Sequence, residues 1–315
     1  RRSGWSEQDV ADLQSWGVNI VRYQMLPYGN PANTREEYEA WIDLEMTKID
    51  GFLVLARKYG MKVVLDLQKG PGTQTFELGS NRMSWDIKDQ DLLIETWRKM
   101  ATHYRGNQDV IYGYDILNEP RENDFVYVPG GGVEWQRLVE RAIEAIREMD
   151  PDTPIIVEAT KYSNPSAFEL LKPINGRNLI YSPHFYSPSS FTHQFIRTNQ
   201  TARTYPGEIG NDIWNKERLR QELAPALAFQ KRYNVPMFLG EFSAVRWADG
   251  ADQWLRDAIE LFEEYGWDWC YHSFREYQGW DLEKEGPRSE PAPSTDNNRK
   301  RVLLQFFEKN VHAGP

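Results

Sequence analysis

Cysteine and long apolar runs are almost absent from this sequence. Its 315 residues include one cysteine, Cys270, which excludes an internal disulfide and a cluster of thiolate metal ligands. Cys270 lies in an apolar, strand-like run and is predicted to be a small core residue. The longest apolar stretches are strand-sized and fall short of the roughly 20 residues that a membrane-spanning helix needs, so no membrane partner is expected.

Positive charge is also scarce relative to negative charge. The chain has 37 basic and 47 acidic side chains, which gives a net charge of −10. This surplus would repel a phosphate backbone or an anionic lipid surface, so nucleic acid is not an expected partner. A neutral substrate fits the charge better.

Several signatures of other chemistries are missing. No strand-like run leads into a Gly-x-Gly-x-x-Gly turn or a Gly-Lys-Ser/Thr loop, and no Gly-x-Ser-x-Gly elbow occurs, which disfavours nucleotide binding and a serine hydrolase. The five histidines include no His-x-His or His-x3-His pair, so no metal and no cofactor are predicted. A metal-dependent barrel hydrolase often has its His-x-His on the first strand, and this possibility stays open if that strand lies outside the sequence.

Short runs of β-branched and aromatic residues alternate with amphipathic stretches along the chain. The seven runs, each predicted to be a buried strand, cover residues 18–24, 63–68, 111–118, 154–160, 179–186, 236–243 and 268–274. Between them apolar residues recur at helical spacing, as at Leu93, Trp97, Met100 and Tyr104. This repetition predicts an α/β fold, either a (β/α)8 TIM barrel or an open doubly wound sheet.

The barrel is favoured because polar residues gather at the C-terminal ends of the runs. A barrel of this size commonly forms one domain, so residues 1–315 are predicted to be a single barrel domain. The chain shows seven runs where a barrel needs eight, and it opens on a predicted helix with a capping pattern at Ser6 to Asp9. We therefore expect that the first strand lies upstream of Arg1 and is missing from this sequence.

Two glutamates each follow a predicted strand. Glu119, within Asn-Glu-Pro, closes the third run, and Glu241, within Leu-Gly-Glu-Phe, closes the sixth. Because the C-terminal ends of barrel strands meet at one face, these carboxylates are expected to face each other across a cleft. Two facing carboxylates are the minimal apparatus for breaking a glycosidic bond, one as proton donor and the other as nucleophile or base. A purely structural interpretation is that each forms a salt bridge at a strand end.

Four segments follow one another at the ends of predicted strands. They are Gly-Val-Asn-Ile-Val-Arg at residues 17–22, Tyr-Asp-Ile-Leu-Asn-Glu-Pro at 114–120, His-Phe-Tyr at 184–186 and Leu-Gly-Glu-Phe-Ser at 239–243. Together they resemble glycoside hydrolase family 5, the large cellulase and mannanase family. The resemblance implies a (β/α)8 barrel with the acid/base glutamate after strand 4 and the nucleophile after strand 7. Glu119 and Glu241 follow the third and sixth runs, so both counts are short by one, in agreement with a missing first strand.

Four further residues are expected to bind substrate or to orient the glutamates. Arg22 matches its family position, and a guanidinium beside Glu241 would keep that carboxylate ionised. The Asn118 amide would hold the sugar 2-hydroxyl. His184 and Tyr186 are two residues apart and share one strand face, from which Tyr186 would donate a hydrogen bond to Glu241. The respective structural interpretations are an ion pair for Arg22, a loop cap for Asn118 and a core pair for the other two.

Two departures from the family pattern concern the sugar subsites. Family members often read Asp-Leu-His after the second visible strand, whereas this chain has Gln68 in place of the histidine, and a glutamine binds hydroxyls but does not titrate. The last strand usually supplies a tryptophan platform, whose place His272 occupies in one register. Trp280 is the leading candidate for a platform, and Trp247 follows Glu241 closely enough to line the cleft.

The resemblance implies a retaining endo-β-1,4-glucanase without a cofactor, with Glu119 as acid/base and Glu241 as nucleophile. A β-mannanase, a xyloglucanase and an exo-β-glucosidase are alternatives within the family, and a carbohydrate-binding barrel without catalysis is an alternative outside it. The expected partner is a polysaccharide or oligosaccharide, and the protein is expected to be a secreted monomer. Residues 73–84 and 193–214 are candidates for the cleft walls, and nothing in them distinguishes glucose from mannose.

Overall fold

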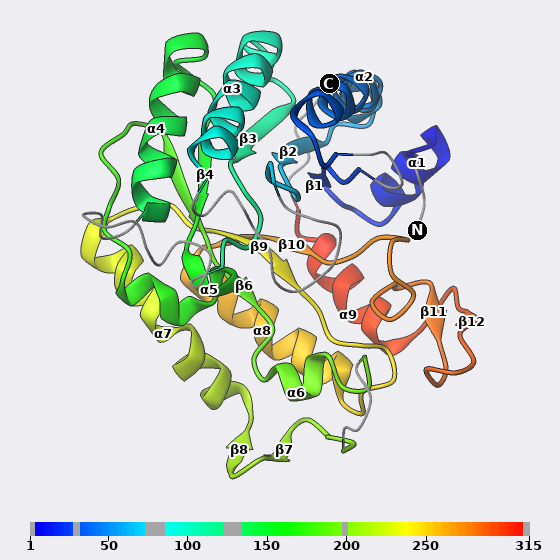
Figure 1. Ribbon diagram of the computed structural model, residues 1–315. Coiled ribbons are helices and arrows are strands. Elements are labelled where there is room, and N and C mark those ends of the chain that lie inside the picture. Colours follow the sequence, from blue (N-terminus) through cyan, green and yellow to red (C-terminus); the bar gives the residue numbers. More distant parts are fainter. Residues whose placement is uncertain (1–3, 28–31, 73–85, 122–133, 197–200, 311–315) are drawn as a thin grey trace.

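The computed structural model describes residues 4–27, 32–72, 86–121, 134–196 and 201–310. The helices are α1 (Glu7–Ser15), α2 (Arg35–Lys58), α3 (Ile87–Tyr104), α4 (Glu134–Met149), α5 (Thr160–Ser163), α6 (Ser189–Thr192), α7 (Lys216–Tyr233), α8 (Ala251–Tyr265), α9 (Asn298–Phe307) and the 3-10 helix Pro165–Glu169. The helices surround a central set of strands (Figure 1).

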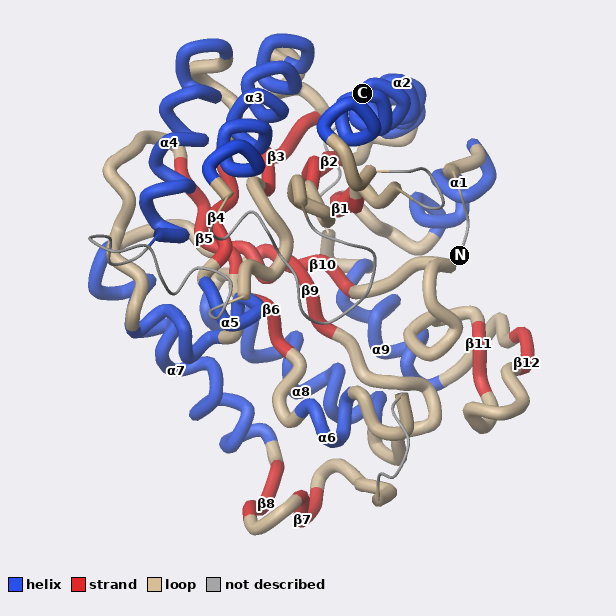
Figure 2. The backbone as a smooth tube through the Cα atoms, in the orientation of Figure 1, coloured by secondary structure: helices blue, strands red, loops and turns tan. Residues whose placement is uncertain are grey.

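Eight parallel strands of the described chain form the central layer, in which the short β5 and β6 follow one another along the same path. One sheet has the order β1 (Ile20–Gln24), β2 (Lys62–Asp66), β3 (Ile111–Asp115), β4 (Ile155–Glu158), β5 (Leu179–Ser182). A second has the order β10 (Asp268–Tyr271), β9 (Phe238–Phe242), β6 (His184–Phe185). One residue separates β5 from β6, and a parallel bridge joins Tyr181 to Met237, so the two sheets are continuous through the β5–β6 segment (Figure 2). The fold is an α/β TIM barrel, as the sequence predicts.

All seven predicted strands are present, with boundaries within a few residues of those expected and with β5 and β6 together forming the fifth. The capping box at the start of α1 is also confirmed, since the Ser6 hydroxyl accepts from the Asp9 amide and the Asp9 carboxylate accepts from the Ser6 amide. Two small hairpins were not predicted: β7 (Gly207–Ile209) with β8 (Asp212–Trp214), and β11 (Lys284–Glu285) with β12 (Ala292–Pro293). The first hairpin lies in the candidate wall segment 193–214, while segment 73–84 lies outside the described residues.

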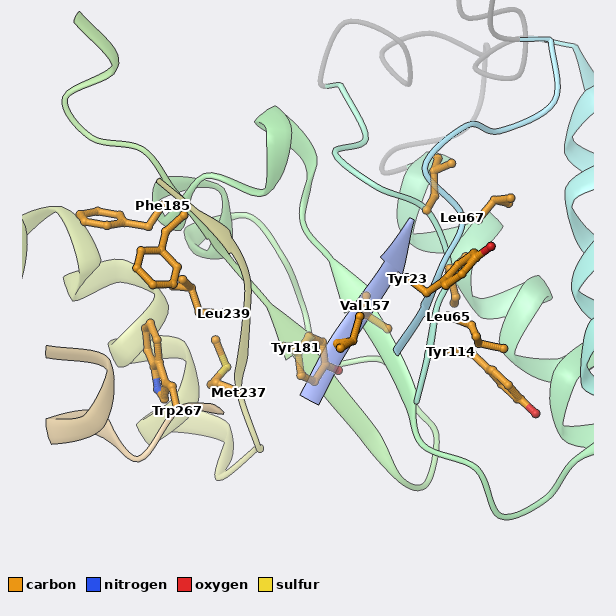
Figure 3. Close-up of a cluster of buried hydrophobic side chains, with 14 of the residues drawn as sticks. Tyr23, Leu65, Leu67, Tyr114, Val157, Tyr181, Phe185, Met237, Leu239 and Trp267 are labelled. Carbon is orange, nitrogen blue, oxygen red and sulfur yellow. The ribbon is translucent and has the colours of Figure 1, made fainter. Parts of the chain in front are cut away.

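The strands present two different faces. Outward-facing side chains such as Tyr23, Leu65, Tyr114, Val157 and Leu239 belong to a large cluster packed under the helices (Figure 3). Inward-facing side chains form a smaller cluster, whose members are Ile20, Val64, Tyr112, Ile156, Ile180, Phe238 and Cys270. This smaller cluster is an apolar layer inside the barrel, and it includes Cys270 as a buried core residue without a disulfide.

A groove separates the first and last strands of the barrel. Within the described chain, β1 pairs with β2 and β10 pairs with β9, but no ladder joins β1 to β10. A cavity of about 380 Å³ lies there, lined by residues 18–24 and 267–276 and by Trp5, Trp16 and Phe307. This is the position that the eighth strand takes in a closed (β/α)8 barrel. The expectation that such a strand lies upstream of Arg1 stays a prediction.

Candidate active site

A charged layer lies directly above the apolar layer inside the barrel. Side chains alternate along a strand, so the residue two positions after an inward-facing one also faces inward. Ile20 is followed in this way by Arg22, Val64 by Asp66, and Ile156 by Glu158. Asp115, the last residue of β3, joins them. The barrel interior therefore changes from apolar to ionic within two residues, at the C-terminal ends of its strands.

Arg22 is the centre of this charged layer. Its side chain is 3% exposed, and its guanidinium lies 3.1 Å from Asp66, 2.9 Å from Asp115, 2.9 Å from Glu158 and 2.8 Å from Glu241. Burial alone would lower the pKa of Arg22, but these carboxylates hold it well above the usual value. The pKa of Asp66 is raised well above normal, chiefly by its complete burial. One guanidinium thus lies within 3.1 Å of four carboxyl groups from four strands.

Glu241 is held on both carboxylate oxygens. Oε1 accepts hydrogen bonds from Arg22 and from the Gln24 amide, each at 2.8 Å, and Oε2 accepts one from the Tyr186 hydroxyl at 3.0 Å. Burial alone would raise the pKa of Glu241, but His272, His184, Arg22 and the Tyr186 bond lower it to about 2. Glu241 is therefore an ionised carboxylate with a fixed orientation.

Glu119 lies four residues beyond the end of β3 and is more accessible than Glu241. Its side chain is 27% exposed, against 7% for Glu241. Its backbone φ is +48°, a left-handed conformation that non-glycine residues adopt rarely. One oxygen of Glu119 and one of Glu241 lie within 4.8 Å of each other. The structure thus brings the two glutamates together at the C-terminal ends of the strands.

His184 lies between the carboxylates. Its Nδ1 is 3.1 Å from Glu119 Oε1 and 4.0 Å from Glu241 Oε2, and its Nε2 is 3.1 Å from Glu158. Burial alone would lower the pKa of His184, but Glu158 and Glu241 raise it well above the usual value. The charged form of the imidazole is therefore favoured, with Nδ1 in a hydrogen bond to Glu119 and Nε2 in an ion pair with Glu158 that lacks regular hydrogen-bond geometry.

Gln24 and His272 belong to the site, although neither was predicted from the sequence to contact Glu241. The Gln24 amide lies 3.3 Å from His272 Nδ1 in addition to its bond to Glu241. His272 also pairs with Glu276 through Nε2 at 3.3 Å. The alternation of strand residues was an available signal, because Gln24 is two positions after Arg22.

Asn118 and Gln68 occupy the loops next to Glu119. The side-chain Oδ1 of Asn118 accepts a hydrogen bond from Arg22 at 3.1 Å, and its backbone N–H donates to the Leu67 carbonyl oxygen. Gln68 follows β2, and its buried Oε1 has no hydrogen-bond partner in the described part of the chain. An amide oxygen of this kind is available to a hydroxyl donor of a ligand.

The two candidate aromatic residues lie in different surroundings. The Trp280 ring centroid is 4.9 Å from that of His272 and 6.1 Å from that of Tyr186, so it borders the groups that contact Glu241. Trp247 instead donates through Nε1 to the Gln194 carbonyl at 2.7 Å and lies under the Arg246 guanidinium. Trp280 is therefore the aromatic side chain nearer to the glutamate pair by its contacts.

Glu119, His184 and Glu241 also form a group of potential metal ligands. Their ligand atoms all lie within 4.8 Å of one another. The Nδ1 of His184 already faces Glu119, and Glu241 is bound by Arg22, Gln24 and Tyr186. These side chains are therefore already engaged with one another.

Among the described helices, none is long and apolar enough to cross a membrane.

An α/β barrel with two facing glutamates at the C-terminal ends of its strands defines a class, the barrel glycoside hydrolases. Comparison with known proteins identifies the family. The model of the family Cellulase (glycosyl hydrolase family 5) matches residues 3–278. The chain therefore belongs to glycosyl hydrolase family 5 and is a glycoside hydrolase.

Individual relatives agree with this assignment. Endoglucanase C of Acetivibrio thermocellus is 27% identical over 288 residues, covering 82% of this chain and 81% of that protein. Cellodextrinase A of Ruminococcus flavefaciens is 24% identical over 271 residues, covering 82% and 75%. A structure of Thermotoga maritima Cel5A with cellobiose has the same fold, with a TM-score of 0.74 and 20% identity over 96% of this chain and 90% of that one.

Proposed function

We propose that this protein is a retaining endo-β-1,4-glucanase in which Glu241 is the nucleophile and Glu119 the acid/base. The observation that carries this proposal is the unequal pair of carboxylates. Glu241 is clamped and ionised, with a pKa of about 2, while one Glu119 oxygen lies within 4.8 Å of it and the Glu119 side chain is 27% exposed. One group is suited to attack and the other to exchange protons.

The reaction has two steps. Glu241 attacks the anomeric carbon while Glu119 gives its proton to the leaving glycosidic oxygen, which forms a glycosyl-enzyme ester and releases one sugar fragment. Glu119, now a carboxylate, removes a proton from water as the water attacks the same carbon and frees Glu241. Each step inverts the configuration at that carbon, so the two steps together retain it.

The short distance between the glutamates supports retention over inversion. Carboxyl groups of retaining enzymes are about 5 to 5.5 Å apart, whereas inverting enzymes leave about 6.5 to 9.5 Å for a water molecule. One oxygen of Glu119 lies within 4.8 Å of one oxygen of Glu241, and this proximity supports the shorter arrangement.

The names of the relatives support a β-glucan as substrate. Endoglucanase C and cellodextrinase A are the relatives described above, and one solved structure holds cellobiose. A further Thermotoga maritima Cel5A structure holds mannotriose, at 21% identity and a TM-score of 0.72, which keeps mannan as the second candidate. Xyloglucan is a third candidate substrate, and exo-acting hydrolysis of short β-glucosides is a different mode of action on the same linkage.

Further residues are assigned by their surroundings. We expect the Trp280 face to stack on a sugar ring beside Glu241, Asn118 to bind the sugar 2-hydroxyl, and Gln68 to bind another hydroxyl. Trp247 would line a more distant subsite. We also propose that residues 1–315 act as one catalytic domain, and that the protein is monomeric and extracellular, acting on a polysaccharide or oligosaccharide.

Reducing-sugar release from a polysaccharide panel tests the proposal. We expect release from carboxymethylcellulose and mixed-linkage β-glucan, with a fall in viscosity before much sugar is freed because the cuts are internal. Faster release from mannan or xyloglucan would change the substrate, and release of glucose alone without a viscosity fall would indicate exo action. A purified, folded protein that hydrolyses none of these polymers or cello-oligosaccharides would support a non-catalytic carbohydrate-binding barrel instead.

A further inference from the structure

Glu158, the last residue of β4, has contacts that the two-step reaction does not use. Its side chain is fully buried, and it reaches three different groups. One oxygen lies 2.9 Å from the Arg22 guanidinium and 3.1 Å from His184 Nε2, while the other accepts the backbone N–H of Glu119 at 2.7 Å. Two of these three contacts lead to Glu119.

The first contact holds the backbone of Glu119. A residue with φ of +48° needs surrounding structure to keep it in that conformation, and a buried carboxylate is a strong acceptor for its N–H group. The second contact works through His184, whose opposite ring nitrogen lies 3.1 Å from Glu119 Oε1. Glu158 therefore meets Glu119 at both ends, directly at the backbone and through the imidazole at the carboxyl group.

The positive charge of His184 depends on Glu158 being an anion. A histidine with a carboxylate 3.1 Å from each ring nitrogen is stabilised as the doubly protonated cation, although complete burial opposes that positive charge. Burial also raises the pKa of Glu158 itself, to about 7, against the opposing effects of His184 and Arg22. The His184 ring faces Glu119 and Glu241 on one side and Glu158 on the other, and Asp115 acts on both Glu158 and the nearby Arg22.

We propose that Glu158 is a positioning residue for the acid/base Glu119, acting through the Glu119 backbone amide and through His184. This inference rests on the proposed function of Glu119. Glu158 touches neither the reacting atoms nor the nucleophile, and its direct hydrogen bond to the catalytic pair is to the Glu119 backbone. Arg22, which Glu158 shares with Glu241, keeps Asp66 and Asp115 as further partners. Loss of Glu158 should therefore weaken the steps that need a proton transfer and spare those that do not.

Aryl β-cellobiosides with different leaving groups test this separation. The value of kcat/KM reports the first step, in which a phenol of high pKa needs a proton from Glu119 and 2,4-dinitrophenolate does not. For Glu158→Gln we expect a loss in kcat/KM of about 100-fold with phenyl β-cellobioside and less than about threefold with the dinitrophenyl substrate. Glu119→Ala should give the same pattern with a larger loss.

Asp66→Asn is the matched control. Asp66 is equally buried, ends strand β2 of the same sheet and lies 3.1 Å from the same Arg22 guanidinium, in an ion pair that does not involve Glu119. Removal of the Asp66 carboxylate acts on the charged layer as a whole. The value of kcat/KM should therefore fall by the same factor for the two aryl substrates. If Glu158→Gln lowers kcat/KM by the same factor for both substrates, the inference is overturned. Glu158 would then support the charged layer in general, as Asp66 does.

A second variant covers a failure of Glu158→Gln to fold. Glu158→Asp keeps the negative charge for His184 and shortens the side chain by one methylene. We expect a smaller loss in kcat/KM than for Glu158→Gln, again larger for the phenyl substrate than for the dinitrophenyl substrate. Equal losses in kcat/KM for the two substrates would overturn the inference. If the folded wild-type protein cleaves neither substrate nor any β-glucan, the proposed function itself fails, which is distinguishable from a uniform loss in the variants.

Discussion

The two glutamates at the centre of the site are held in opposite ways. Glu241 has three hydrogen-bond donors on its carboxylate and a pKa of about 2, and its side chain is 7% exposed. Glu119 has its carboxylate near one imidazole and a side chain that is 27% exposed, while its backbone N–H is bound by Glu158. The protein fixes the side chain of one glutamate and the backbone of the other.

This difference matches two different chemical tasks. A nucleophile gains from being ionised and immobile, because its attack geometry is prepared before the substrate arrives. An acid/base must lose and regain a proton in each turnover, so tight binding of its anion would oppose the first half of the cycle. Substitutions at the two positions should therefore fail in different ways.

Glu241→Ala should have the largest effect. Removal of the nucleophile is expected to reduce kcat on the order of 10⁶-fold, comparable with other removed nucleophiles. Azide fills the space and attacks directly, so a glycosyl azide of inverted configuration should form, which NMR of the product measures. A glycosyl azide of retained configuration would mean that Glu241 is the acid/base and would reverse the comparison.

Glu119→Ala should have a smaller effect that depends on the substrate. Loss of general acid catalysis is expected to lower kcat/KM about 10² to 10⁴-fold for poor leaving groups and little for dinitrophenolate. Azide should raise the turnover of the dinitrophenyl substrate and give a product of retained configuration. Wild-type enzyme with azide is the control, and an inverted product would contradict the assignment.

Tyr186→Phe should have the smallest effect on kcat/KM of the three substitutions, and it tests what sets the pKa of Glu241. The Tyr186 hydroxyl lowers the pKa of Glu241, so its loss raises that pKa toward the ordinary value. Since the ionised form is active, the acid limb of the kcat/KM profile should move to higher pH, with a loss of about tenfold for one hydrogen bond to a charged group. An unchanged acid limb would show that the nucleophile is controlled elsewhere.

Tyr205→Phe is the control for this measurement. Tyr205 is a buried tyrosine that donates to Asp257 at 2.7 Å, so it loses the same kind of bond at a pair outside the glutamate site. This variant should alter the melting temperature and leave the pH profile in place.

Much of the fold was accessible from the sequence because strand and helix periodicities are local properties. The third run was predicted to extend to residue 118, whereas β3 ends at Asp115. The excess arises because residues 116 and 117 are buried and apolar although their backbone has left the regular ladder. The hairpin β7–β8 was missed because each of its strands has only three residues, although the positive φ of Gly210 marks a turn that a Gly-Asn pair favours.

The site was accessible only in part, for a related reason. The motifs supplied Glu119, Glu241, Arg22, His184 and Tyr186, and the structure brings these side chains together. The buried carboxylates Asp66, Asp115 and Glu158 were not singled out, since each is an ordinary acidic residue in its own segment. Only the register between strands turns them into ligands of one guanidinium.

Side chains at the ends of β1 and β10 meet beside the nucleophile. Gln24 ends β1 and His272 follows β10, and the two lie 3.3 Å apart next to Glu241. Displacement of β1 from β10 would break the Gln24 and Arg22 bonds to Glu241 together and leave the Tyr186 bond in place. Amide hydrogen exchange in β1 and β10 should therefore accelerate on warming at the temperature where activity falls, below global unfolding.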